Sequence, residues 1–134
     1  MSLESRSLLR EGISYFQRAV KSHDMVTEVY IDDICYYKAI ATIQRKYGIE
    51  DLKAYIADVY ILTASDVAEV MERYPDIDCI VVISNWNQYT DLAKENAKML
   101  GVGVFTLKQF LAALNYEGRK FLDTGIAKAV EEEY

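Results

Sequence analysis

The stretch Cys79-Ile80-Val81-Val82-Ile83-Ser84 decides the fold of this 134-residue chain. Its apolar residues follow one another without interruption, and most of them are β-branched, which favours a β-strand. A strand that is apolar on both faces is typical of a parallel sheet covered by helices on either side. We therefore predict an interior strand over residues 79–84 and expect its polar end at Asn85 to open onto the ligand-binding edge of the sheet.

Predicted strands and helices alternate around this strand. Upstream, β-branched and aromatic residues favour a strand from Ala57 to Thr63, and Ser65-Asp66 can cap a helix that ends before Pro75. Downstream, the sequence predicts a helix from about residue 90 to Gly101, a strand at 102–106, and helices at 107–114 and 119–132. Alternation of this kind implies right-handed crossovers and parallel pairing.

The N-terminal third gives a mixed pattern. Apolar residues at spacings of three and four predict an amphipathic helix from Leu3 to about Val20. Residues 25–31 fit a strand by their β-branched side chains and a helix by their spacing, so both assignments stay open. From Asp33 onward the apolar spacing predicts a second helix, which Gly48 ends.

Length and composition are those of one domain. The chain is 51% hydrophobic and 27% charged, which is too apolar for a disordered protein. A chain of this length buries roughly two thirds of its unfolded surface on folding. We predict a single α/β domain over residues 1–134, with a three- to four-stranded, mainly parallel sheet flanked by helices and a helical N-terminal portion.

The cysteine count and the hydropathy pattern indicate the cellular compartment. Two cysteines, Cys35 and Cys79, do not make a disulfide framework, so a reducing environment is expected. No signal peptide is recognisable, and no apolar run reaches the roughly 18 residues of a membrane helix. We expect a cytoplasmic protein that does not insert into a membrane.

The charge balance bears on nucleic-acid binding. The formal net charge is −6 and the isoelectric point is near 4.8. Surfaces that hold nucleic acid by general phosphate neutralisation usually show clustered lysine and arginine residues. The overall charge argues against such a surface, while a local basic patch stays compatible with the sequence.

Polar residues after two predicted strands form the candidate ligand site. In an open parallel sheet, ligands gather beyond the carboxyl ends of the strands. The ligand-binding residues predicted on this basis are Thr63, Asp66, Ser84, Asn85, Trp86 and Asn87. Amides, a hydroxyl group and an indole ring can bind a base, a sugar or a peptide by hydrogen bonding and stacking. In a second interpretation, Asn85 and Asn87 form the turn and Trp86 covers the edge of the core.

Acidic residues raise the question of a metal-dependent nuclease, which needs two or three carboxylates converging with a lysine. The acids considered are Glu28, Asp32, Asp33, Asp51 and Asp58. Asp33, Asp51 and Lys53 would form such a site, although each acid is equally explained as a surface charge or a helix cap. His23 is the only histidine, which gives little support to a zinc site or a catalytic triad. We predict no catalytic residues, no metal site and no cofactor.

The chain has eleven tyrosines. Tyr30, Tyr36, Tyr37 and Tyr47 fall in the region whose spacing indicates helix. They fit either a core with hydrated hydroxyl groups or a self-association surface, so a homodimer through a tyrosine-rich helical surface is one prediction.

Several segments carry a resemblance to a known superfamily. They are Asp78 to Asn85, Tyr89-Thr90, Ala93 and Ala97, Gly101 to Phe105, and Phe110-Leu111. Through them the chain resembles the C-terminal part of restriction-endonuclease-like domains, particularly the Mrr-like branch, over about residues 54–114. In such domains a late strand ends near a polar turn, an alanine-rich helix follows, and a short strand leads to a closing helix.

The resemblance does not extend to an intact catalytic motif. The superfamily is named for a PD-(D/E)xK signature that holds a divalent metal and activates water. The strand in the corresponding place reads Ile56-Ala57-Asp58-Val59-Tyr60, with tyrosine where the family has lysine, and the only matching triplet is Asp51-Leu52-Lys53. The resemblance thus implies a relative that keeps the scaffold and has lost the metal site.

Three functions follow from these observations. The first is a non-catalytic restriction-endonuclease-like domain that binds nucleic acid or a nucleic-acid-associated protein. The second is a small-ligand or regulatory binding domain of Rossmann-like or flavodoxin-like topology, which uses the strand ends at Thr63, Asp66, Asn85 and Trp86. The third is a divalent-metal-dependent nuclease.

Overall fold

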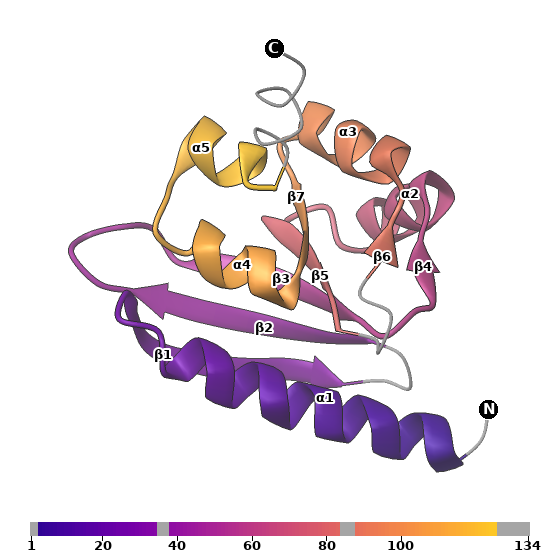
Figure 1. The fold of residues 1–134 in the computed structure, drawn as a ribbon, viewed down its shortest axis with the longest axis horizontal. Helices are drawn as coiled ribbons and strands as arrows, with labels where there is room; N and C mark the ends of the chain where they lie inside the picture. The colour runs from indigo at the N-terminus through magenta and orange to yellow at the C-terminus, as the bar shows by residue number, and fades with distance from the viewer. Residues whose placement is uncertain (1–2, 35–37, 84–87, 126–134) are drawn as a thin grey trace.

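The computed structural model describes residues 3–34, 38–83 and 88–125 of the chain (Figure 1). Five helices and seven strands occur in these residues. The helices are α1 (Leu3–Lys21), α2 (Ala64–Arg73), α3 (Asp91–Met99), α4 (Leu107–Ala113) and α5 (Gly118–Asp123). The strands are β1 (Val26–Ile34), β2 (Lys38–Arg45), β3 (Leu52–Ala57), β4 (Ile61–Leu62), β5 (Cys79–Val82), β6 (Gln88–Tyr89) and β7 (Gly103–Thr106).

The main sheet has five strands in the order β1-β2-β3-β5-β7. The pairs β1/β2 and β2/β3 are antiparallel, whereas β3/β5 and β5/β7 are parallel. The α/β class and the helical N-terminal portion are confirmed. A three- to four-stranded, mainly parallel sheet is not borne out, because β1, β2 and β3 form an antiparallel meander. The sheet also does not have the Rossmann-like or flavodoxin-like topology of the second hypothesis, because three of its five strands are in this meander.

The meander accounts for the error in the N-terminal half. The open assignment at residues 25–31 resolves as strand β1, and the helix predicted from Asp33 to Gly48 is wrong because β2 occupies that region. Ile40 and Ile43, which suggested one helical face, point to opposite faces of β2 and are buried on both. Gly48, read as a helix end, lies in the β2–β3 turn at φ 73°, a conformation that suits glycine in either setting.

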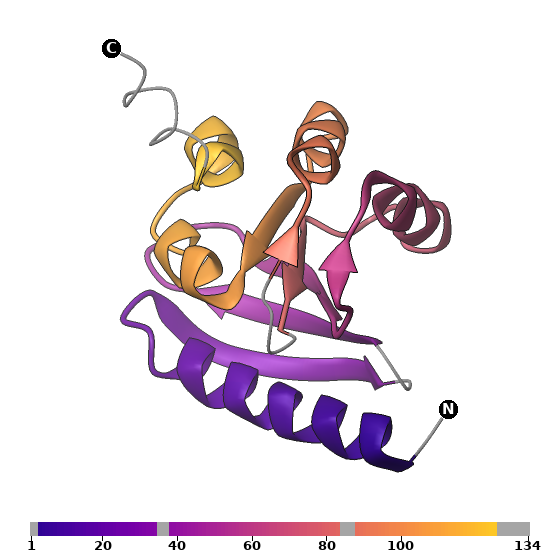
Figure 2. The same cartoon turned by 45° about the vertical axis from the view of Figure 1, so that its right-hand side comes forward.

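The strand predicted from Ala57 to Thr63 is not continuous, because β3 already ends at Ala57 and β4 covers only Ile61–Leu62. Leu52, Ala54 and Ile56 face one core and are buried, while Tyr55 between them is half-buried on the other face. After Ala57 the chain leaves the sheet and forms the short strand β4. This strand pairs in parallel with β6, and Figure 2 shows the two lying side by side.

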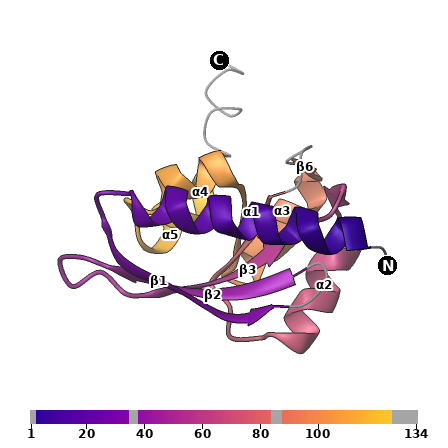
Figure 3. The same ribbon diagram turned by 90° about the horizontal axis from the view of Figure 1, so that it is seen from below.

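The central prediction of a buried interior strand is confirmed for Cys79–Val82. Each of its four residues is buried, and β5 is paired with β3 on one side and β7 on the other. One core, with Phe16, Phe105 and Phe110, packs α1, α4 and α5 against one face of the sheet. A second core packs α2 and α3 against the other face, and Figure 3 shows α1 and α2 on opposite sides. Ser84, the predicted end of this strand, lies outside the described residues.

The helices of the C-terminal half begin within two residues of the predicted positions, but α2 is capped by Thr63 and not by the predicted Ser65-Asp66. Thr63, Thr90 and Thr106 cap α2, α3 and α4 by accepting hydrogen bonds from backbone N–H groups. The last predicted helix, 119–132, is present as α5 as far as Asp123, and residues 126–132 lie outside the description. Among the helices that the structure describes, none is both long enough and apolar enough to cross a bilayer.

Candidate functional site

The predicted ligand residues at the start of α2 are occupied by helix capping. The backbone N–H and the hydroxyl group of Thr63 donate to Asp66 Oδ2 at 2.9 and 3.0 Å, and the Asp66 backbone N–H donates to Thr63 Oγ1 at 3.2 Å. This reciprocal arrangement is a capping box. Thr63 thus caps α2 and does not line the cavity described below, whereas Asp66 does. Ser84, Asn85, Trp86 and Asn87 lie outside the described residues.

A cavity of about 250 Å³ lies between β3 and α2, and we call it the β3–α2 cavity. Its lining comes from the carboxyl half of β3, the segment after it, and one face of α2. The lining residues are Tyr55, Ala57, Val59, Leu62, Asp66, Glu69, Val70, Arg73 and Tyr74. The cavity thus lies beside the carboxyl half of β3, where the chain leaves the main sheet.

Two tyrosine rings line the cavity. The ring centroids of Tyr55 and Tyr74 are 5.5 Å apart, and the ring planes are inclined at 50°. Tyr55 comes from β3 and Tyr74 caps the carboxyl end of α2, so 19 positions of sequence separate them. Two inclined rings offer a ligand a corner of π surface rather than a single flat wall.

The remaining walls are apolar and firmly packed. Ala57 and Leu62 are 2% and 1% exposed, and Val70 is also buried. All three belong to the core under α2 and α3, with Val59 packed against it. On α2, Asp66, Glu69, Val70 and Arg73 face the cavity because residues spaced by three and four share one side of a helix. The cavity is therefore built on rigid elements.

Three charged side chains form the rim. Arg73 and Glu69 make a long ion pair of 3.9 Å, and their side chains are 62% and 67% exposed. Exposed pairs of this kind contribute little stability in water, so either side chain can turn toward a ligand. With Asp66, the rim holds two carboxylates against one guanidinium group.

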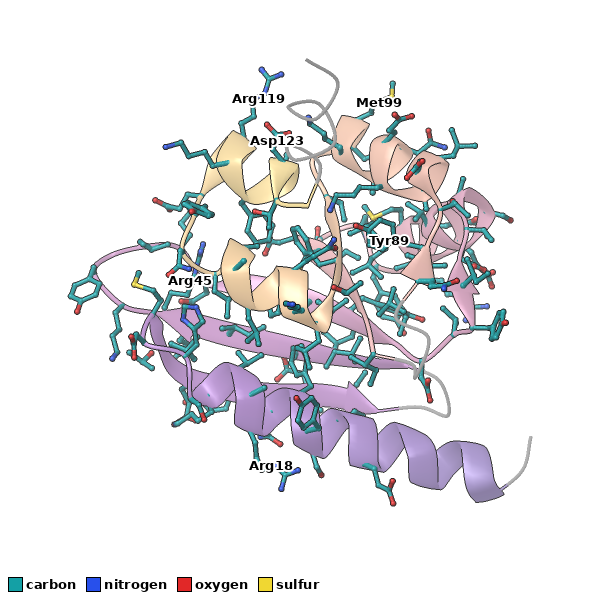
Figure 4. The ribbon with its side chains drawn as sticks, in the orientation of Figure 1. Arg18, Arg45, Tyr89, Met99, Arg119 and Asp123 are labelled. Atoms are coloured by element: carbon teal, nitrogen blue, oxygen red, sulfur yellow. The ribbon has the colours of Figure 1, made fainter. Side chains whose placement is uncertain are left out.

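A second hollow, of about 190 Å³, opens at the amino ends of β3 and β5. Its charged lining consists of Arg45, Glu50, Asp51, Asp78 and Glu117. Arg45 lies beside α4 (Figure 4) and donates from Nε to the Glu50 carbonyl at 2.9 Å and from Nη1 to the Leu114 and Tyr116 carbonyls at 3.2 and 2.8 Å. Burial lowers the pKa of Arg45. This guanidinium group joins the β2–β3 turn to the end of α4.

The acids considered for a metal site are dispersed. Asp32 accepts a hydrogen bond from the Thr42 hydroxyl group at 2.6 Å. Glu28 accepts one from Lys21 at 2.7 Å, and this bond lowers the pKa of Glu28. Burial raises the pKa of Asp58 after β3. Within residues 3–34, 38–83 and 88–125, no group of three or more His, Cys, Asp or Glu is arranged to hold a metal ion. The side chain of Asp33 is not among those described.

A buried lysine at the edge of the sheet was not predicted from the sequence. Lys94, on the first turns of α3, is only 4% exposed, and its ammonium group donates to the Val104 carbonyl of the edge strand β7. Its Nζ lies 4.4 Å from the ring centroid of Phe105 and 5.2 Å from that of Tyr89. Burial lowers the pKa of Lys94 to about 8. The available indication was its position three residues before the buried Ala97, on the apolar side of α3.

The surroundings of Lys94 identify it as a structural residue. Gly103 donates its backbone N–H to the Asp78 carbonyl, on the side of β7 that faces β5. The next carbonyl, that of Val104, therefore points to the open side of β7, at the edge of the sheet. The Thr106 N–H, also on the open side, donates to Gln109 Oε1 at 3.1 Å, which in turn accepts from the Tyr89 hydroxyl at 2.7 Å. Burial raises the pKa of Tyr89. These side chains cover an edge that would otherwise invite strand pairing.

The tyrosines predicted to form a helical dimer surface lie elsewhere. Tyr30 is on β1 and is 49% exposed, and Tyr47 is in the β2–β3 turn and is 84% exposed. The predicted tyrosine-rich helix is therefore not formed, because β1 and β2 take its place. Tyr36 and Tyr37 lie outside the described residues.

Comparison with protein-family models, with curated proteins and with solved structures found no significant match to this chain. The β3–α2 cavity is thus the candidate site on geometry alone.

Proposed function

We propose that this domain binds a small molecule in the β3–α2 cavity and acts as a binding domain rather than an enzyme. The observation that carries the proposal is a cavity with two tyrosine rings, four apolar side chains and a charged rim. Ligand sites in proteins commonly combine apolar walls with a few convergent polar groups. The capping role of Asp66 supports binding over catalysis, since its carboxylate is already engaged by Thr63.

The volume of the cavity limits the ligand. About 250 Å³ lies just below the range of roughly 300–1,000 Å³ in which drug-sized ligands bind. A molecule with one ring, or a compact branched group with a short chain, matches this space. A dinucleotide or a peptide of several residues does not.

A ligand-observed NMR screen of single-ring and branched compounds tests the proposal. Binding to the wild-type protein should be lost in Tyr74→Ala, which removes one ring of the corner. Tyr30→Ala is the matched control, because it deletes a half-exposed tyrosine of β1 that does not line the cavity. Circular dichroism confirms that both variants are folded. Binding that survives in Tyr74→Ala, or that is lost equally in both variants, would reject the cavity as the site.

A second candidate function is the non-catalytic restriction-endonuclease-like domain that binds nucleic acid or an associated protein. It is favoured by the order of elements over residues 54–114, where β5, α3 with buried Ala93 and Ala97, β7 and α4 with buried Phe110 follow one another. Lys108 on α4 and Arg119 and Lys120 on α5 are exposed basic residues, and these two helices contact each other.

Duplex DNA binding measured by fluorescence anisotropy at two salt concentrations tests this candidate. Affinity should fall with salt, and it should fall further in the double variant Lys108→Glu, Arg119→Glu. Arg18→Glu on α1 is the control for a change of charge elsewhere, since Arg18 is also exposed. The candidate fails if no binding is seen at about 50 mM salt, or if the affinity at about 200 mM salt is the same.

A further inference from the structure

We infer that the ligand of the β3–α2 cavity is an organic cation, namely a compact alkylammonium group; this inference rests on the proposed function. The class follows from the rim, the tyrosine rings and the helix end, each of which bears separately on the charge of the ligand.

The rim favours positive charge. Asp66 and Glu69 outnumber Arg73, and the long, exposed Glu69–Arg73 pair leaves the Glu69 carboxylate accessible. The net charge of −6 on the whole chain also attracts cations over distances of about a Debye length. The acidic rim and the negative net charge would both repel an anionic ligand.

The tyrosine rings suit the same ligand. A cation over the face of a tyrosine ring, within about 6 Å of its centroid, is attracted by the negative charge density of that face. The Tyr55 and Tyr74 centroids are 5.5 Å apart with an angle of 50° between the planes, so a compact ammonium group can contact both rings. Apolar Val59, Leu62 and Val70 contact the alkyl substituents that such a group carries.

The amino end of α2, which would favour an anion, already carries a carboxylate of its own. Helix N-termini bind anions through their free N–H groups. Here the Asp66 N–H donates to Thr63 Oγ1 and the Val67 N–H donates to the Thr63 carbonyl. The Asp66 carboxylate also lies in the first turn, where it offsets the positive end of the helix dipole.

Three probes separate charge from shape: choline, its neutral isostere 3,3-dimethylbutan-1-ol, and the anion 3,3-dimethylbutanoate, which is similar in size. Dissociation constants come from chemical-shift titrations of the ¹⁵N-labelled full chain. Choline should bind about fivefold more tightly than the alcohol, and the anion should bind most weakly. Equal binding of choline and the alcohol overturns the cation inference and leaves the proposed function standing.

A matched pair of variants on α2 assigns the effect to the rim. Glu69→Gln should weaken choline binding about threefold and leave the alcohol unchanged, because it removes one carboxylate at constant shape. Glu72→Gln is the control, since Glu72 is exposed on the same helix and does not line the cavity. Equal weakening in both variants overturns the inference. If no probe binds but screened neutral compounds do, only the inference fails; if nothing binds at all, the proposed function fails with it.

Discussion

Replacing Lys94 with methionine should change how the stability of the protein depends on pH. The Lys94 ammonium group is 4% exposed and lies between the rings of Tyr89 and Phe105, with the Val104 carbonyl as its acceptor. Burial lowers its pKa from 10.5 to about 8 in the folded chain. Between these two values the unfolded chain binds more protons than the folded one, so the free energy of unfolding rises with pH. Methionine fills a similar volume and does not titrate.

The size of the effect follows from the pKa. Each unit of pKa shift corresponds to about 1.4 kcal/mol. At pH 7 both states of the wild-type chain hold the proton, and at pH 9.5 the folded state has passed its pKa by about 1.5 units. The free energy of unfolding of the wild type, relative to that of Lys94→Met, should therefore rise by about 2 kcal/mol from pH 7 to pH 9.5.

Urea denaturation of both proteins at pH 7 and pH 9.5, followed by circular dichroism, measures this difference. Subtracting the variant from the wild type cancels the titration of the other lysines and tyrosines. Lys108→Met is the matched control, because Lys108 is exposed on α4 and the substitution shows what the loss of a lysine at the surface does. A Lys94→Met difference that does not change with pH, or that falls as pH rises, would refute the burial of a charged lysine at the edge of β7.

Two further predictions concern the scaffold. Arg45→Met should lower the free energy of unfolding by about 2–5 kcal/mol, because it leaves the Glu50, Leu114 and Tyr116 carbonyls without their donor. Urea denaturation measures this loss, and a loss below about 1 kcal/mol would contradict the prediction. Thr63→Ala should lower the free energy of unfolding by about 1 kcal/mol, because it removes the cap of α2, and it should leave ligand affinity nearly unchanged. A large loss of affinity without a loss of stability would instead make Thr63 a ligand residue.

The C-terminal half of the fold could be predicted because local and tertiary preferences agree there. Cys79–Val82 is apolar on both faces and is buried on both. The predicted helix from about residue 90 to Gly101 is also present, as α3 with its cap at Thr90 and Gly101 just after its end. Such agreement between sequence pattern and fold is what makes an assignment reliable.

The antiparallel meander could not be predicted because its residues satisfy two periods at once. In β2, Ile40 and Ile43 are three residues apart, as on a helix, yet each is buried by a different layer of helices. A sheet covered on both sides buries odd and even positions alike, which removes the alternation that identifies a strand. Gly48 ended the predicted helix and equally suits the turn of a hairpin.

Of the predicted ligand residues, Asp66 lines the β3–α2 cavity, whereas the aromatic part of its lining was not predicted. Asp66 was selected from its position after a strand and does line the cavity. Tyr55 and Tyr74 were missed because they lie on different elements, and only the packing of α2 over β3 brings their rings together. Lys94 was missed because a lysine on an alanine-rich helix is ordinarily exposed, and its acceptor on β7 depends on strand order.

The position of a bound compound decides whether the β3–α2 cavity is the ligand site. In a ¹³C-methyl-labelled sample, titration of a compound found by the NMR screen should shift the methyl resonances of Val59, Leu62 and Val70, and the compound should show nuclear Overhauser contacts to them. The largest shifts at Leu52 or Leu122, which line the hollow at the amino ends of β3 and β5, would place the ligand elsewhere and contradict the account.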